Sequence, residues 1–509
     1  MAEENQQTEE QVVESAQTPV EEKKPVNKVD AWFGITRSGS SFKTEIVAGL
    51  TTFMAMVYIL MVNAGMFQYV IGGEDPYGAA YIATAIGAII GTMLMALYAK
   101  MPLAQASGMG VNAFIVYTLV LGGTGLTYAN CMVFTLLDGV IFVVLTATGL
   151  RQKIFAAIPA GVRHAIPVGI GLFIAFIGMQ NAGIVIDSST LVGFVSFNVL
   201  NSANSFMTYN AGTVGGMLPA LVAILGVIAI AIMAKKGVKG AILWGILGTA
   251  VVFYALAGIA YGCGSEGAAG FFGGISLSNP FNAFAEWGKN SVGKVFTEGF
   301  NFSAYLGVEG NNAGTLVVLI ITTALSLCMI DMFDTIGTLY GACSKGNLLD
   351  ENGTPIRMNQ MMLADAVATC TGAIAGTSTV TTFVESSSGV AAGGKTGFTS
   401  LVTAICFIIA MFLSPIAQLI PSCATATALI WVGVLMMTSV VKVDWEDASE
   451  AIVAFLTFIV MVLGYSISKG IGIGIISYII VKVCTGKVKE VSIPTWVIGA
   501  VFLATFILT

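Results

Sequence analysis

The chain has 509 residues, of which 56% are hydrophobic and only 10% are charged, and its formal net charge is −6. Apolar stretches of about 20 residues, the length that a helix needs to cross a bilayer, recur along nearly the whole chain. This composition excludes a soluble globular protein, and the acidic balance argues against nucleic acid as a partner. We therefore expect an all-α polytopic membrane protein embedded in the lipid bilayer.

Cysteine and histidine usage gives little support for metal chemistry. The eight cysteines are scattered singly, without a CxxC pair, and His164 is the single histidine. Such a pattern is typical of small core residues and not of a disulfide framework or a zinc site. We expect no metal ion and no cofactor.

The first 30 residues are rich in Glu, Gln, Thr and Lys and lack the apolar stretch of a signal peptide. We predict that residues 1–30 form a disordered cytoplasmic tail. The predicted membrane-spanning segments then follow at 45–67, 79–99, 102–122, 127–149, 163–181, 213–234, 239–262, 312–342, 361–377, 379–394, 397–420, 424–441 and 449–486, the last read as a hairpin. A final apolar segment at 492–508 is either the last of about fourteen segments or an additional helix.

Basic residues indicate the orientation of these segments. Three groups fall on one side if every segment crosses: Arg37 and Lys43; Arg151, Lys153 and Arg163; Lys235, Lys236 and Lys239. The positive-inside rule makes that side, and the N-terminus, cytoplasmic. The long loop 263–311 then lies outside and divides the chain into two repeats, 31–262 and 312–509. Equivalent positions in the two repeats are separated by seven segments. Because this number is odd, the second repeat is predicted to insert in the opposite orientation.

Each repeat carries a broken apolar segment two spans after its start, at 104–114 and at 376–389. Polar or glycine-rich interruptions at matching positions are the best sequence indication of a transporter binding site. The run Thr379 to Val384 is β-branched and aromatic, which favours a short strand before a helix N-terminus. Since an extended backbone needs hydrogen-bond partners inside a membrane, we predict that the two broken segments pair as two short strands.

Two carboxylates one helical turn apart, Asp331 and Asp334, lie in the middle of the segment 312–342. A charge near the bilayer centre costs roughly 2.5–3.5 kcal/mol, so these residues are candidates for function. At positions i and i+3 they share a helix face, and ionising both in a dry site is unfavourable; such a pair can hold a proton and couple transport to it. The alternative is a structural pair that is hydrogen-bonded to Thr335 and Thr338.

Other polar residues carry similar alternatives. Glu385 either faces a ligand or caps the half-helix that follows it. Asn112 either contributes to the site or satisfies the broken backbone beside its own strand. Asp365 is expected to pair with Arg357 or Lys345 and not to bind a ligand.

Four separated motifs stand in order along the chain: Gly49-Leu-Thr-Thr-Phe-Met-Ala-Met-Val-Tyr-Ile-Leu60, Gly108-Met-Gly-Val-Asn-Ala113, Asp331-Met-Phe-Asp-Thr-Ile-Gly-Thr338 and Gly376-Thr-Ser-Thr-Val-Thr-Thr-Phe-Val-Glu-Ser386. Together they resemble the AzgA-like adenine, guanine and hypoxanthine permeases, a branch of the nucleobase-cation symporters of the nucleobase-ascorbate transporter type. The resemblance runs from about Trp32 to the C-terminus. The chain departs from the family at Ala64 and Ser107, where the family usually has proline.

The resemblance implies fourteen segments in two inverted repeats of seven. It also implies a core domain, approximately 43–150 plus 312–421, that holds substrate and moves against a gate domain, approximately 151–262 plus 422–509. Its short strands lie in segments 3 and 10.

Carried over by motif, the substrate-site residues are Asn112, Asp331 and Glu385, with Asp334 and Asp331 as the acidic pair for proton coupling. A purine edge suits a carboxylate and a carboxamide, and an aromatic ring such as that of Phe383 covers its flat face.

The resemblance therefore implies proton-coupled import of purine nucleobases through the cell membrane. The alternatives are a uracil or xanthine carrier of the same fold, an anion carrier, sodium coupling, a passive channel and a membrane enzyme. An anion carrier is expected to have a basic or neutral site, and an enzyme needs a nucleophile–base set or metal ligands that are not evident. The sequence leaves open whether the chain is a monomer or a homodimer.

Overall fold

The computed structural model describes residues 26–149, 158–188, 191–198, 205–210, 213–275, 279–351 and 353–508. Most of the predicted N-terminal tail, together with Arg151 and Lys153, lies outside these ranges. Within them, nine helices are long and apolar enough to cross a membrane, and four more apolar helices are shorter. The protein is therefore a mainly α-helical multi-pass membrane protein with a few short strands.

The first half of the chain contains α2 (Lys28–Phe33), α3 (Phe42–Met56), α4 (Tyr58–Phe67), α5 (Pro76–Leu94), η1 (Met95–Ala99), β1 (Gln105–Ser107), α6 (Met109–Ala113), η2 (Phe114–Val120), α7 (Tyr128–Ala147), α9 (Ala160–Asn181), α10 (Met217–Lys235) and α11 (Ala241–Gly262). The second half contains α16 (Ala313–Lys345), α17 (Met358–Ala375), β6 (Val380–Thr382), α18 (Ser386–Ala391), α19 (Gly397–Met411), α20 (Ser414–Gln418), α21 (Ser422–Met436), η3 (Met437–Lys442), α22 (Ala448–Leu463), α23 (Ile467–Cys484), η4 (Val488–Glu490) and α24 (Ile493–Leu508). The segment 449–486 is thus two helices, as predicted for a hairpin.

Local sequence explains where many of these helices begin. Asp75 accepts a hydrogen bond from the Gly78 N–H, and Pro76 occupies the first turn of α5, where its missing N–H costs nothing. Thr127 and Asn130 form a reciprocal capping box at α7, and Asn312 and Thr315 form another at α16. These caps satisfy N–H groups that the helices leave without partners.

Two parts of the chain contain elements that the sequence did not predict. Between α9 and α10 lie two hairpins, β2 (Val185–Ser188) with β3 (Leu191–Phe194) and β4 (Thr208–Asn210) with β5 (Thr213–Gly215). The predicted loop 263–311 folds into short helices: α12 (Glu266–Gly273), α13 (Pro280–Asn290), α14 (Lys294–Thr297) and α15 (Ser303–Leu306). These elements are short, and only longer periodic segments are predicted from the sequence.

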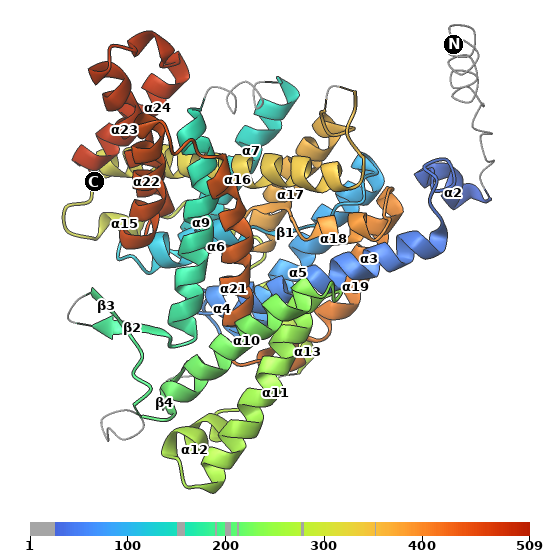
Figure 1. The fold of residues 1–509 in the computed structure, drawn as a ribbon. Helices are drawn as coiled ribbons and strands as arrows, with labels where there is room; N and C mark the ends of the chain where they lie inside the picture. The colour runs from blue at the N-terminus through green and yellow to red at the C-terminus, as the bar shows by residue number, and fades with distance from the viewer. Residues whose placement is uncertain are drawn as a thin grey trace, which may run out of the picture.

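The long helices pack in two groups. In the first packing group, α3, α4, α5, α7, α17 and α19 contact one another; in the second, α9, α10, α11, α21, α22 and α23 do so. Figure 1 shows α9 and α21 side by side at the centre, with α22 to α24 at the upper left and α10 to α12 reaching the bottom.

Glycine explains the close approach of α9 and α21. An added Cβ at Gly171 would lie 2.6 Å from the Cβ of Met436, and one at Gly433 would lie 2.5 Å from the Gly171 carbonyl oxygen. Small residues are the usual means by which helices approach closely where lipid supplies no hydrophobic drive.

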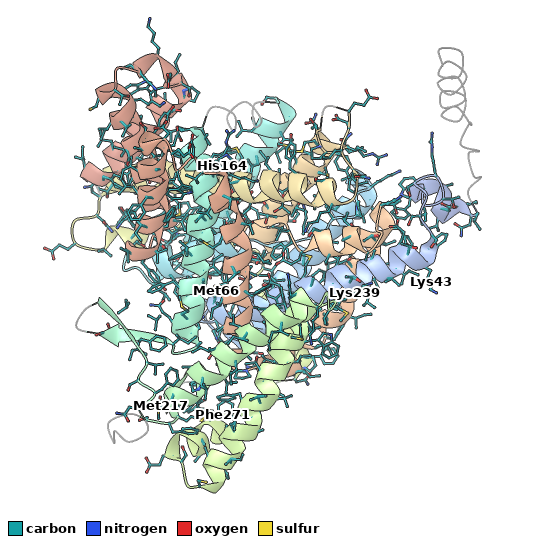
Figure 2. The ribbon with its side chains drawn as sticks, viewed as in Figure 1. Lys43, Met66, His164, Met217, Lys239 and Phe271 are labelled. Atoms are coloured by element: carbon teal, nitrogen blue, oxygen red, sulfur yellow. The ribbon has the colours of Figure 1, made fainter. Side chains whose placement is uncertain are left out.

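Lys43 and Lys239 lie toward one end of the α10–α11 pair, and α12 lies toward the other (Figure 1 and Figure 2). Figure 2 shows Lys43 and Lys239 toward one end, and Met217 and Phe271 toward the other.

Candidate functional site

The two broken segments meet as predicted. β1 pairs antiparallel with β6, with Gln105 opposite Thr382, Ala106 opposite Thr381 and Ser107 opposite Val380. The ladder continues at both ends, where the Gly108 N–H donates to the Thr379 carbonyl at 2.9 Å and the Phe383 N–H to the Ala104 carbonyl at 3.1 Å. The strands therefore satisfy each other's backbone groups, which permits extended chain inside a membrane bundle.

A cavity of about 300 Å³ lies beside this strand pair. One side of its wall is formed by Gly108 to Gly110 at the start of α6, by Phe333, Asp334, Gly337 and Thr338 of α16, and by Thr381 to Glu385 at and after β6. The other side comes from the second packing group, with Pro167 and Ile174 of α9 and Val432, Leu435 and Met436 of α21. The wall contains two carboxylates and two phenylalanines. It can therefore offer hydrogen-bond acceptors to the edge of a flat ligand and aromatic rings to its face.

Glu385 lies in the cavity wall and is only 7% exposed. The Tyr58 hydroxyl, from the start of α4, donates to Glu385 Oε1 at 2.7 Å. The Glu385 side chain makes no capping hydrogen bond to α18, although the residue occupies the N-cap position. The Glu385 side chain therefore does not act as a helix cap. Its carboxylate is held at the cavity by the hydrogen bond from Tyr58.

The structure separates the two acids of α16. Asp334 lines the cavity, and its Oδ2 lies 3.9 Å from where a Cβ on Gly110 would stand. Asp331, one turn earlier, is fully buried and is not among the described residues that line the cavity. Thr335, one of its expected partners, donates instead to Asp365.

Asn112 is fully buried behind the strands and does not line this cavity among the described residues. Its Oδ1 accepts hydrogen bonds from Ser107, at 2.9 Å, and from Ser378. Asn63 joins the same cluster, because its Nδ2 donates to Thr377 Oγ1 at 3.1 Å. Asn112 thus connects the side chains that flank both strands.

Phe383 was the remaining site candidate, and the structure places it in the cavity wall beside Glu385, where it is 6% exposed. The structure therefore brings Glu385, Phe383 and Asp334 to one cavity. It places Asp331 and Asn112 in the surrounding protein.

Asp365 is a residue whose place the sequence reasoning missed. It is fully buried in α17 and accepts hydrogen bonds from Thr335 Oγ1 at 2.7 Å, from the Thr382 N–H at 3.1 Å and from Gln105 Nε2 at 3.3 Å. Its expected partners donate elsewhere: Arg357 to the Ala99 carbonyl and Lys345 to Ser387 Oγ. The available signal was the rule already applied to Asp331, that an acid inside an apolar segment has a specific partner.

Asp365 ties α17 to α16 and to both strands through these three bonds. A carboxylate that accepts several hydrogen bonds is a stable acceptor in a buried site, and losing it would leave each donor unsatisfied. Asp365 therefore positions the strand pair that forms one wall of the cavity.

Among the described residues, no group of three or more His, Cys, Asp or Glu side chains is placed to hold a metal ion. A helical bundle in which two interrupted segments meet beside a cavity is the arrangement of a secondary transporter.

Comparison with known proteins agrees with this class. Residues 43–473 match the model of a family described as the permease family. A guanine/hypoxanthine permease of Bacillus subtilis is 36% identical over 94% of this chain and 100% of its own length. An adenine permease of Escherichia coli is 33% identical over 94% of this chain and 95% of its own length. The chain belongs to the permease family and is a transporter, not an enzyme.

The fold is also known from a solved structure. The transmembrane domain of a cyanobacterial bicarbonate transporter superposes with a TM-score of 0.55, covering 84% of this chain and 96% of that one at 14% identity. At that identity the likeness concerns the fold alone.

Proposed function

We propose that this transporter imports purine nucleobases, namely adenine, guanine and hypoxanthine, through the cell membrane by proton symport. The observation that carries the proposal is the acidic cavity, in which Glu385 is held by Tyr58 and lies with Phe383 and Asp334 beside the crossing of two broken segments. The names of the two relatives support purine bases as substrates.

Glu385 is the proposed acceptor for a purine N–H, through the carboxylate oxygen that Tyr58 does not engage. Phe383 and Phe333 are proposed to cover the face of the ring. Asn112 and Asp331 are proposed to act indirectly, without lining the cavity. Asn112 positions the strand segments through its hydrogen bonds with Ser107 and Ser378, and Asp331 lies on α16 one turn from Asp334.

Asp334 is the proposed carrier of the coupling proton, with Asp331 as its neighbour in the acidic pair. Burying an unpaired carboxylate in a cavity away from bulk water has a high free-energy cost. Protonation of Asp334 when substrate binds would remove that charge and lower the free energy of the closed, loaded site. Sodium is the alternative cation, since a carboxylate can also bind it.

Alternating access is proposed to move a core domain, approximately 43–150 plus 312–421, against a gate domain, approximately 151–262 plus 422–509. Two features support this division. The two packing groups fall on either side of it, and the cavity lies between the second group and α6, β6 and α16, which belong to the core range. We further propose fourteen segments in two inverted repeats, 31–262 and 312–509 about the external loop 263–311, with a cytoplasmic N-terminus and α24 either completing the second repeat or added to it.

Uptake by cells that lack their own purine transporters tests the proposal. Expression of the chain is expected to cause saturable accumulation of labelled hypoxanthine, guanine or adenine, which unlabelled purines inhibit and a protonophore abolishes. Uptake of uracil, xanthine or bicarbonate without uptake of adenine, guanine or hypoxanthine would overturn the substrate class. Uptake that follows sodium and ignores the protonophore would overturn proton coupling only.

A further inference from the structure

A second cavity, of about 700 Å³, adjoins the first. The two share Pro167, Phe333, Gly337, Gly341, Ser439 and Lys442 in their walls. Cavities of roughly 300–1,000 Å³ hold drug-sized ligands, so the adjoining pair offers more room than a nucleobase alone needs.

The second cavity is basic, whereas the first is acidic. Its wall includes Arg163 and His164 from the first turns of α9 and Lys442 from the end of η3, and none of its described lining residues is an Asp or Glu. The chain as a whole has an acidic balance, with 28 Asp and Glu against 22 Lys and Arg. The positive-inside rule accounts for basic residues on a cytoplasmic side, but not for their convergence on one cavity from two separate elements.

The basic side chains, and not the N–H groups at the N-terminus of α9, are the candidate anion-binding groups of this cavity. Glu450, from α22, already approaches that helix end, since its Oε2 would lie 2.3 Å from a Cβ on Gly161. Lys442 is exposed and lines both cavities, so this residue lies where the acidic and the basic parts join.

An uncharged nucleobase has no use for Arg163 and His164, which lie beyond its own cavity, or for the cationic group of Lys442 at the junction of the two cavities. A ligand that matches both parts has a purine ring for the acidic cavity and an anionic group, a sugar's length away, for the basic one. We propose that the adjoining cavities bind a purine nucleoside monophosphate from the cytoplasmic side, with its phosphate at Arg163, His164 and Lys442, and that this ligand blocks transport. The inference rests on the proposed transport of purines.

Direct binding to the purified full-length chain in uncharged detergent tests this. Guanosine monophosphate and adenosine monophosphate are expected to bind at least tenfold more tightly than guanosine and adenosine, and the difference is expected to shrink as salt is raised. Arg163→Gln and His164→Gln, which line the second cavity and not the first, are each expected to weaken nucleotide binding severalfold while base uptake in cells persists. Lys239→Gln, a lysine outside the cavity wall, is the matched control and is expected to change neither.

Each other outcome overturns the proposal. Equal affinity for nucleotide and nucleoside would show that the basic wall does not bind the phosphate. Inorganic phosphate that competes as well as the nucleotide would show a simple anion site. Nucleotide binding that disappears in vesicles containing anionic phospholipid, but not in vesicles of neutral lipid, would assign the site to lipid headgroups. If base uptake itself is absent in the unmodified chain, the proposed function fails; if base uptake is present without nucleotide discrimination, only this inference fails.

Discussion

Replacing Glu385 by Gln tests the centre of the proposed site. Glutamine keeps the size of the side chain, and its carbonyl oxygen can still accept the hydrogen bond that Tyr58 donates at 2.7 Å. The change removes the charge that strengthens a bond to a purine N–H, which is worth about 1.5–3 kcal/mol. Because every 1.4 kcal/mol corresponds to about tenfold in affinity, purine binding is expected to weaken by roughly one to two orders of magnitude.

The assay is the concentration dependence of labelled hypoxanthine uptake, with the amount of protein in the membrane measured in parallel. Glu286→Gln is a matched control, because Glu286 also accepts hydrogen bonds, from the Glu74 N–H and from Asn290 Nδ2, but lies in α13 outside the cavity wall. The reasoning is refuted if Glu385→Gln reaches the membrane normally and shows the affinity of the unmodified protein.

Tyr58→Phe examines the same contact from the other partner. Losing the donor of a buried carboxylate costs about 1–3 kcal/mol, and the freed carboxylate is expected to turn from its position, so affinity should fall by about tenfold. Tyr81→Phe removes a buried hydroxyl that donates to the Ala410 carbonyl at 2.9 Å, away from the cavity, and is expected to leave affinity unchanged. Equal behaviour of the two variants would mean that Tyr58 does not position Glu385.

Three further substitutions test other parts of the site. Asp334→Asn should abolish concentrative uptake and its dependence on external pH between about 5 and 8, while substrate exchange persists; uptake that still follows the proton gradient would rule out Asp334 as the proton carrier. Asp365→Ala should destabilise the protein by about 3 kcal/mol or more, seen as earlier thermal unfolding in detergent, since three donors lose their acceptor; an unchanged unfolding temperature would contradict its positioning role. Gly337→Leu should block uptake by filling the cavity without disturbing the fold, because nothing lies within 4 Å of a Cβ at this position. Gly258→Leu, at an equally open position outside the cavity wall, is the control and should transport normally. Full activity of Gly337→Leu would show that this cavity is not on the transport path.

The broken segments show how far sequence could predict the site. Two physical rules were sufficient to pair them: a β-branched run favours extended chain, and extended chain inside a membrane needs a partner strand. The same rules could not predict the packing between elements. Asp331 and Asp334 share a helix face in sequence, yet only Asp334 borders the cavity, because the direction in which α16 faces its neighbours is decided by tertiary contacts.

Hydrogen bonds between distant segments were the least predictable feature. Tyr58 and Glu385 are 327 residues apart, and no local pattern indicates that the hydroxyl of one will meet the carboxylate of the other. Asp365 was misjudged for the opposite reason. Basic residues near it in sequence offered plausible partners, but the carboxylate is buried against the strands and those basic residues bond to other groups.

Register explains how Ser107 can stand where relatives are expected to have proline. Ladder bonds join Gly108 to Thr379 and Phe383 to Ala104, so in the alternating antiparallel pattern Ser107 and Val380 form a non-hydrogen-bonded pair. The N–H of Ser107 is therefore not needed by the ladder, and either proline or serine fits the backbone there.

The same two strands serve two purposes through the alternation of their side chains. Gln105 and Ser107 point to one face, where they bond to Asp365 and to Asn112, whereas Thr381, opposite Ala106, points to the other face and lines the cavity; Thr382, opposite Gln105, borders the cavity as well. The hydrogen bonds that Gln105 and Ser107 make on one face therefore fix the position of the strand pair, and with it the position of Thr381 at the cavity. Because each strand comes from a different half of the chain, this joint also binds the halves together at the cavity. A movement of one packing group against the other can then change the opposite wall, formed by α9 and α21, without disturbing the strand pair.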